Sequence, residues 1–165
     1  MIAAEALGIS FRPISDDDLP FLFTVYASTR AEELAVTGWP DEMKQQFLAQ
    51  QFDAQHRHYQ RHYPDAEWLV IERGGDPVGR LYVEEWESQM RIIDISLLPA
   101  ARGGGVGSAI LGDLMRDAAA KSKRVSIQVE RTNPAMRLYH RLGFVTLEEQ
   151  AVYHRLEWEP PKSSA

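Results

Sequence analysis

A glycine-rich turn between an apolar run and a helical pattern constrains the fold of this chain more than any other feature. The apolar run from Met90 to Leu98 ends at Pro99, and the turn Arg-Gly-Gly-Gly-Val-Gly-Ser follows at 102–108. Apolar residues then recur at helical spacing from Gly105 to Lys121. Glycines let the backbone approach a bulky anion, and the first N–H groups of a helix have no partners within it. The sequence therefore predicts an anion site, suited to phosphate, where this helix begins.

This turn differs from the two best-known phosphate-binding loops. It lacks the Lys-Ser/Thr pair of a P-loop, and the strand before it continues an antiparallel meander, where a dinucleotide-binding fold would begin a strand–helix–strand unit. Arg102 adds a positive charge beside the glycines, and Ser108 adds a hydroxyl in the first helical turn. In a chain of net charge −6, donors for a polyphosphate must be concentrated locally in this way.

The segments before the turn predict helices followed by a meander of strands. Ser15 and the aspartates at 16–18 indicate a helix start, because a hydroxyl caps the first turn and carboxylates favour the helix dipole there. The turn Gly74–Pro77 joins two strand-like runs as a hairpin. The expected elements are a strand at 9–14, a helix to about 29, a helix after Trp39-Pro40 to about 62, and strands at 67–73, 78–86 and 90–98.

The segments after the turn change to a strand–helix–strand pattern, which implies a parallel crossover. The expected elements are a helix at 105–121, a strand at 124–129, a helix at 134–141, and strands at 143–147 and 150–158. The fold class is thus α/β (or α+β), with a mixed, mostly antiparallel central sheet and flanking helices. We expect one domain over residues 1–159 and a short C-terminal tail over 160–165.

Composition excludes several other functions. The chain has no cysteine, so structural disulfides, thiolate metal sites and a covalent acyl-cysteine intermediate are ruled out. Its negative net charge argues against broad binding to nucleic acid. The first residues resemble no signal peptide, and no apolar run is long enough for a membrane span, so we expect no membrane association and a cytoplasmic location.

A second motif follows the turn by about thirty residues, and with it the sequence resembles the GNAT (general amine N-acetyltransferase) superfamily. That family is recognised by an Arg/Gln-x-x-Gly-x-Gly/Ala loop, then a strand, then Asn-x-x-Ala-x-x-x-Tyr-x-x-x-Gly-Phe. The loop is matched by Arg102, Gly105 and Gly107, and the second motif by Asn133, Tyr139, Gly143 and Phe144. Met136 replaces the commoner alanine of the motif, and the small residue is shifted to Ala135.

The resemblance implies acetyl-CoA as co-substrate and a place for each part of it. In such proteins the strand before the loop, here Asp94 to Leu98, splays from its parallel neighbour and pairs with the pantetheine arm, here through Leu97 and Leu98. The pyrophosphate would lie on Gly103, Gly104, Gly105, Val106, Gly107 and Ser108, beside Arg102. Asn133 would contact the cofactor from a strand end, and Tyr139 would lie close to its sulfur.

The chemistry of transfer assigns further roles. An amine attacks a thioester, so the tetrahedral oxyanion needs a donor, for which the Leu97 N–H is the candidate. The departing thiolate needs a proton, which Tyr139 can donate because a phenol is protonated at pH 7. An alkyl ammonium must lose a proton before attack. Asp94 interrupts an apolar run and is the candidate base if it faces a substrate cleft; otherwise it accepts hydrogen bonds from a nearby loop. Glu84, Glu85 or a water chain are the alternatives. The two glutamates are neighbours on a strand and point to opposite faces, and each also fits a solvated strand end.

Other features are compatible with a structural role or a functional one. His56, His58 and His62 suggest metal ligands, but no carboxylate or thiolate completes a shell, so no metal is expected. The aromatic side chains of Trp39, Trp86 and Trp158 fit either a core or an acceptor pocket. The aspartates at 16–18 fit either a solvated helix start or a site that attracts a cationic acceptor.

Two functions fit these features. The first is a coenzyme A-dependent N-acetyltransferase with direct transfer to an amine, which could be a polyamine, an aminoglycoside-like amine, an amino acid or a protein amine. The alternative is a non-catalytic acyl-CoA-binding module. The sequence is compatible with a homodimer and specifies neither the oligomeric state nor the acceptor.

Overall fold

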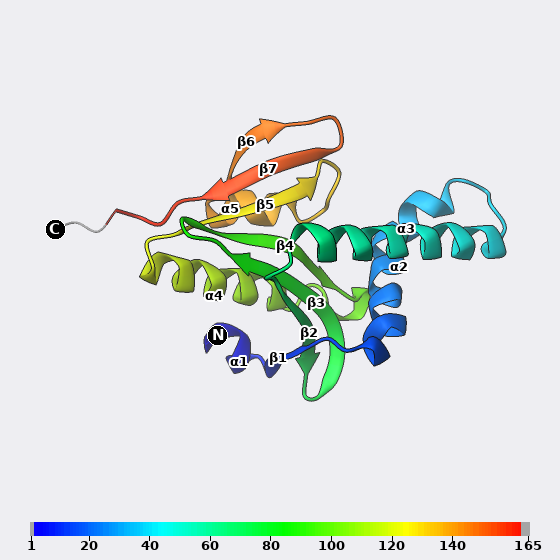
Figure 1. The fold of residues 1–165 in the computed structure, drawn as a ribbon, viewed down its shortest axis with the longest axis horizontal. Coiled ribbons are helices and arrows are strands. Elements are labelled where there is room, and N and C mark those ends of the chain that lie inside the picture. Colours follow the sequence, from blue (N-terminus) through cyan, green and yellow to red (C-terminus); the bar gives the residue numbers. More distant parts are fainter. Residues whose placement is uncertain (1, 163–165) are drawn as a thin grey trace.

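The computed structural model describes residues 2–162 and contains a seven-stranded sheet in the order β1-β2-β3-β4-β5-β7-β6 (Figure 1). All neighbours pair antiparallel except β4 and β5, which are parallel. The predicted mixed, mostly antiparallel fold is thereby confirmed. The strands are β1 (Ile9–Pro13), β2 (Glu67–Arg73), β3 (Asp76–Glu85), β4 (Gln89–Leu97), β5 (Arg124–Glu130), β6 (Val145–Glu149) and β7 (Tyr153–Trp158). The helices are α1 (Ile2–Ala6), α2 (Leu19–Ala35), α3 (Asp41–His62), α4 (Val106–Ala120) and α5 (Met136–Leu142), with 3-10 turns η1 (Asp16–Asp18) and η2 (Pro99–Ala101).

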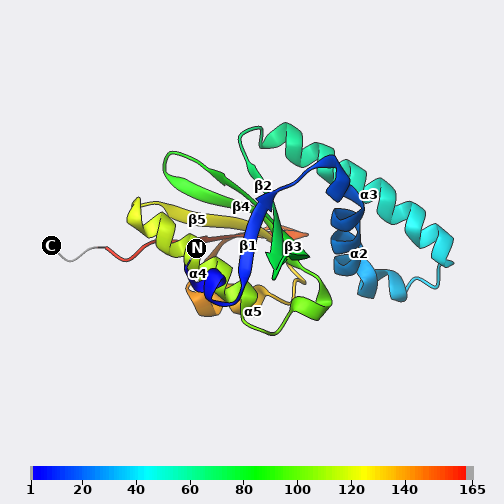
Figure 2. The same ribbon diagram turned by 90° about the horizontal axis from the view of Figure 1, so that it is seen from below.

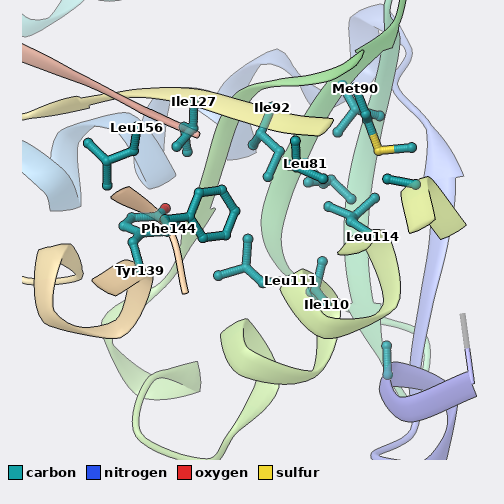
Figure 3. Close-up of a cluster of buried hydrophobic side chains, with 14 of the residues drawn as sticks. Leu81, Met90, Ile92, Ile110, Leu111, Leu114, Ile127, Tyr139, Phe144 and Leu156 are labelled. Carbon is teal, nitrogen blue, oxygen red and sulfur yellow. The ribbon is translucent and has the colours of Figure 1, made fainter. Parts of the chain in front are cut away.

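Helices cover both faces of the sheet, with α2 and α3 on one face and α1, α4 and α5 on the other (Figures 1 and 2). The larger apolar cluster lies under α4 and α5 and includes Leu81, Leu111 and Phe144 (Figure 3). A smaller cluster around Leu22 and Tyr82 lies under α2 and α3. Alternate residues of a strand point to opposite faces, so β3 supplies both clusters and joins the two layers.

The parallel pair β4–β5 is hydrogen-bonded over only part of its length. Pairing runs from Gln89 opposite Arg124 to Ile92 opposite Ile127, and both strands continue beyond that point. On the other edge of β4, Tyr82 pairs with Asp94 and Val83 with Ile92, so Ile93 is an extra residue that forms a β-bulge. A bulge bends its strand and increases the local twist. The predicted splay of Asp94 to Leu98 from the parallel neighbour is present, and the bulge lies where it begins.

Helix α1 was not predicted, because its stability comes from a contact distant in sequence. Asp113, in the middle of α4, is buried and accepts hydrogen bonds from the backbone N–H groups of Ala3 (3.0 Å) and Ala4 (2.9 Å). The first N–H groups of a helix lack acceptors within the helix, and the Asp113 carboxylate accepts hydrogen bonds from two of them. Five residues alone would not hold a helix in water.

Several predicted boundaries were also wrong, for local reasons. Helix α2 continues to Ala35, since no glycine or proline interrupts it before Gly38. The hairpin turn is shorter than expected, because Gly74 and Gly75 alone form it, at φ of +57° and +87°, and β3 starts at Asp76. Residues 160–162 of the expected tail have no regular structure, and residues 163–165 lie outside the described residues.

Gly79 fixes how closely β3 approaches the splayed part of β4. A Cβ atom at this position would lie 2.3 Å from the carbonyl oxygen of Ser96, which belongs to the backbone of β4 and cannot rotate away. We expect Gly79→Ala to lower the free energy of unfolding by about 1–3 kcal/mol, the usual cost of overpacking. Denaturant-induced unfolding would measure this loss.

Gly112→Ala is the matched control, since Gly112 lies inside α4 and its added methyl would meet only the flexible end of Arg116, at 3.4 Å. Alanine is the better helix former by up to about 1 kcal/mol, so this variant should be neutral or more stable. Equal stability of the two variants would contradict the close approach inferred at Gly79.

Candidate active site

The glycine-rich bend before α4 presents a row of free backbone amides. Gly103 and Gly105 have φ of +79° and +82°, values that strongly favour glycine. The first helical bond joins the N–H of Ala109 to the carbonyl of Gly105 (2.9 Å), and no side chain caps the helix. Within residues 2–162, the N–H groups from Gly103 to Ser108 therefore have no hydrogen-bond partner. Together with the helix dipole they form an anion site.

Two arginines lie beside this bend. The Nε of Arg102 donates to the carbonyl oxygen of Leu97 (3.0 Å), so this guanidinium lies between the bend and the splayed strand. Arg73, the last residue of β2, places an Nη2 atom 3.8 Å from where a Cβ of Gly104 would be. Sequence reasoning missed Arg73, because no motif surrounds it and only the pairing of β2 with β3 brings it near.

Antiparallel pairing decides which main-chain groups of β4 are free. The N–H of Leu98 donates to the carbonyl of Val78 (2.8 Å), so Leu98 faces β3. Hydrogen-bonding direction alternates along an antiparallel strand, so Ile95 and Leu97 direct their N–H and C=O groups to the opposite edge, where β5 has parted. The prediction that Leu98 offers its N–H to a ligand was wrong. Among the described residues, Ile95 and Leu97 are therefore the ones that direct main-chain groups to the open edge, in place of Leu97 and Leu98.

Tyr139 lies on the face of the sheet that α4 and α5 cover. Its side chain is 3% exposed and packs edge-on against Phe144, with ring centroids 5.7 Å apart (Figure 3). Its hydroxyl has no hydrogen-bond partner among residues 2–162. Burial raises the pKa of Tyr139, and the negative charge of Asp94 raises it further, so the phenol stays protonated at neutral pH. The hydroxyl can therefore act as a proton donor.

Asn133 and its neighbours start helix α5. The Oδ1 of Asn133 accepts from the N–H of Ala135 (2.8 Å), and its carbonyl accepts from the N–H of Met136 (3.1 Å). The side-chain oxygen of Asn133 is thus bonded within the turn that starts α5, while its amide nitrogen has no partner among the described residues. Ala135 and Met136 both pack against the larger apolar cluster, so the motif's shifted small residue is accommodated.

Asp94 lies on the opposite face of the sheet, in an ion pair. Its Oδ2 contacts Nη2 of Arg80 on β3 (2.5 Å), and its Oδ1 accepts from the Ser96 hydroxyl (2.7 Å). The same Nη2 of Arg80 also donates to Gln55 of α3 (2.9 Å). The carboxylate was expected to face a cleft or to serve a nearby loop. Its actual partners are a buried arginine and a serine on its own strand.

Glu84 and Glu85, the other candidate bases, lie at the far end of β3. Glu84 is buried and accepts from the N–H of Asp65 (3.2 Å) and from Nε1 of Trp86 (2.9 Å), so its expected solvation was wrong. Glu85 is exposed, and hydrogen bonds from Lys121 and Lys123 lower its pKa. Both carboxylates have structural partners, and they point to opposite faces as predicted.

The histidines lie on α3, and the aspartate run forms the 3-10 turn η1 before α2. The rings of His58 and His62 lie 4.0 Å apart on one face of α3, while His56 stacks on Phe52. Residues 2–162 contain no group of three His, Cys, Asp or Glu side chains placed to bind a metal. Of the aspartates at 16–18, Asp18 is buried and pairs with Arg12 at 2.7 Å.

The tryptophans differ in exposure. Trp39 is exposed beside Phe47, Trp86 stacks on Tyr63, and Trp158 lies against Gly143. None of the three contacts the ion pair or the bend. In the part of the chain that the structure describes, no helix combines the length and apolarity needed to cross a bilayer.

Comparison with known proteins agrees with this geometry. Residues 28–144 match the sequence profile of the acetyltransferase (GNAT) family, and the chain belongs to that family. No curated protein matches the sequence closely enough to count as a relative.

Solved structures show the same fold. The PaiA N-acetyltransferase from Thermoplasma acidophilum, in complex with coenzyme A, is 16% identical and superposes with a TM-score of 0.67 over 92% of this chain and 98% of its own. An acetyltransferase from Thermus thermophilus is 18% identical, with a TM-score of 0.65 over 93% and 97%. YncA from Salmonella typhimurium, with acetyl-CoA, is 20% identical, with a TM-score of 0.55 over 95% and 96%.

Arg73 gives a test of the bend as the phosphate site. If coenzyme A binds here, as the sequence predicts, Arg73→Ala should weaken its binding about 3- to 10-fold, because a charge-assisted contact to phosphate is lost. Isothermal titration calorimetry would measure the affinity. Arg61→Ala removes the same charge from the exposed face of α3 and should leave affinity unchanged.

Repeating the titration with dephospho-coenzyme A, which lacks the ribose phosphate, shows which phosphate Arg73 contacts. An effect that disappears with this ligand places the contact at the ribose phosphate, and one that persists places it at the pyrophosphate. Unchanged affinity of Arg73→Ala for both ligands would contradict a role for Arg73.

Proposed function

We propose that this chain is an enzyme that transfers an acyl group, acetyl in the first instance, from coenzyme A directly to an amine. The observation that carries the proposal is the juxtaposition of the free amides of Gly103–Ser108 with the unpaired edge of β4. A ligand with a diphosphate at one end and an amide-containing arm at the other matches both features. Coenzyme A has this chemistry, and its presence in the structures of PaiA and YncA supports the assignment.

The residues present fit this co-substrate. The amides of the bend and the charges of Arg102 and Arg73 would hold the diphosphate. The main-chain groups of Ile95 and Leu97 would pair with the arm, as an added strand pairs with an open sheet edge. The carbonyl of Leu97 is bonded to Arg102, so Arg102 would turn from Leu97 to phosphate when the ligand binds.

The reaction joins an amine nitrogen to the acyl carbon and breaks the carbon–sulfur bond. An alkylammonium ion and an acetyl thioester give an acetamide, a free thiol and one proton. The Leu97 N–H, on the open edge of β4, would stabilise the oxyanion of the tetrahedral intermediate. Tyr139 would protonate the departing sulfur from the other face of the sheet. The chain has no cysteine to hold the acyl group, so transfer is direct.

Asp94 is the group proposed to receive the proton from the ammonium, directly or through water. It lies on the α2–α3 face, opposite Tyr139, so acid and base would act from two sides of the gap. Its carboxylate contacts Arg80 at 2.5 Å and is largely buried, with 14% of the side chain exposed. Glu84 and Glu85 are committed to other partners at the far end of β3.

An assay of thiol release separates the enzyme from the alternative acyl-CoA-binding module. The protein would be mixed with acetyl-CoA and a panel of amines, and free thiol would be followed with time. We expect release that depends on the amine and on protein concentration. Binding of acetyl-CoA without amine-dependent release across the panel would refute the enzyme and favour the module.

Tyr139→Phe tests the proton donor. Removing the hydroxyl should lower kcat about 100-fold or more, the usual contribution of general acid catalysis, while the affinity for coenzyme A stays within about two-fold. Tyr63→Phe, at the end of α3, is the matched control and should not change kcat. Unchanged turnover in Tyr139→Phe would show that another group protonates the sulfur.

A further inference from the structure

The ion pair between Arg80 and Asp94 is the most unusual buried feature on the α2–α3 side. The Arg80 side chain is 3% exposed and that of Asp94 is 14% exposed. Burying two charges costs free energy that a pair of apolar side chains would not, and a buried pair is therefore weak evidence for a stabilising role alone. The pair adjoins the open edge of β4, where an acceptor amine must arrive.

Most of the hydrogen-bonding capacity of Arg80 is unused. Its Nη2 makes both bonds to Asp94 and Gln55, whereas its Nε is buried without a partner and its Nη1 has none among residues 2–162. The hydroxyl of Tyr82 is also buried without a partner, and the Arg80 guanidinium lies over the Tyr82 ring, 5.1 Å from its centroid. Buried donors without partners are uncommon, and each calls for a ligand or an ordered water.

Asp94 also retains acceptor capacity. A carboxylate can accept about four hydrogen bonds, and the two that Asp94 accepts come from Arg80 and Ser96. A positive and a negative group thus lie side by side, each able to bind one more partner. Tyr59 and His56 of α3 lie near this pair. Burial and the negative charge of Asp94 raise the pKa of Tyr59. Burial and the positive charge of Arg80 lower the pKa of His56.

Two further acidic groups on this side are paired with arginines. Glu130, at the end of β5, pairs with both terminal nitrogens of Arg30 on α2, at 2.5 and 2.9 Å. Asp18 pairs with Arg12. These two carboxylates are thus neutralised in place.

We infer that the acceptor is an α-amino acid, or a close analogue that carries a carboxylate on the carbon next to the amine. The inference rests on the proposed function and names its substrate class. The zwitterion would bind the ion pair with opposite polarity, its carboxylate accepting from Nη1 of Arg80 and its ammonium beside Asp94. The guanidinium holds Asp94 through Nη2 and offers Nη1 separately, so it would fix the orientation of the amine as well as its affinity.

Matched pairs of acceptors test this with the wild-type enzyme. Each pair consists of an amino acid and its decarboxylated amine: phenylalanine and phenethylamine, tryptophan and tryptamine, leucine and isoamylamine, histidine and histamine, lysine and cadaverine. For the pairs that react, kcat/KM should favour the amino acid about 10-fold or more, because a charge-assisted pair is lost with the carboxylate. Equal or better turnover of the decarboxylated members would overturn the inference.

Binding of the products separates this inference from the proposed function. Calorimetry with coenzyme A present would compare N-acetyl amino acids with the corresponding N-acetyl amines. If no amine is acetylated but N-acetyl amino acids bind at least about 10-fold more tightly, the enzyme proposal fails and the carboxylate site stands. If both N-acetyl series bind equally, or neither binds, the carboxylate site is refuted.

Arg80→Lys tests the residue itself. Lysine keeps the charge that balances Asp94, so the fold is spared an unpaired buried carboxylate, but it has one nitrogen and cannot offer a second, separate nitrogen to a substrate carboxylate. The preference for amino acids should fall about 10-fold, mainly through a higher KM for the carboxylate-bearing member. Arg57→Lys, on the exposed face of α3, is the matched control and should keep the wild-type preference. An unchanged preference in folded Arg80→Lys would overturn the assignment.

Discussion

The end of hydrogen bonding between β4 and β5, after Ile92 and Ile127, is the constraint on which the rest of this structure depends. The bulge at Ile93 bends β4 away from its parallel neighbour just before the strand runs into the glycine-rich bend. A parallel sheet normally satisfies both edges of its inner strands. Here an inner strand keeps one edge free, and that edge continues into the free amides at the start of α4. Free backbone groups thus lie on the open edge of β4, and a second set follows at Gly103–Ser108 after the hydrogen-bonded turn η2.

The two faces of this opening have different chemistry. Under α4 and α5 the wall is apolar, and the Tyr139 hydroxyl is the polar group within it. Under α2 and α3 the wall carries the buried charges of Arg80 and Asp94, with Gln55 and Ser96 bonded to them. The asymmetry suits a reaction in which a thiolate gains a proton on one side and an ammonium loses one on the other. Under the proposed function, the acceptor would be bound by the α2–α3 layer.

Local signals in the sequence were enough for most of the fold and for the coenzyme side. The glycine bend and the helix after it are contiguous in the sequence, so local signals located Gly103–Ser108 and α4, while Tyr139 was assigned through the family resemblance of the second motif. The failures involved contacts between distant strands. Pairing with β3 determines whether Leu97 or Leu98 has a free N–H. The bulge at Ile93 shifts the register of that pairing by one residue, and no sequence pattern predicts the bulge. For the same reason Arg73 and Arg80 were missed and Glu84 was expected to be solvated.

The carboxylate of Asp113 has a mechanical consequence for the coenzyme side. It anchors the N-terminal segment to the middle of α4, while Leu111 and Ile110 fix the same helix against the sheet. A helix held on two sides cannot slide along its axis, so its amides stand ready before any anion arrives. On the other face of the sheet, α2 is tied to the end of β5 by the ion pair of Arg30 with Glu130. Each layer is thus fastened by a carboxylate.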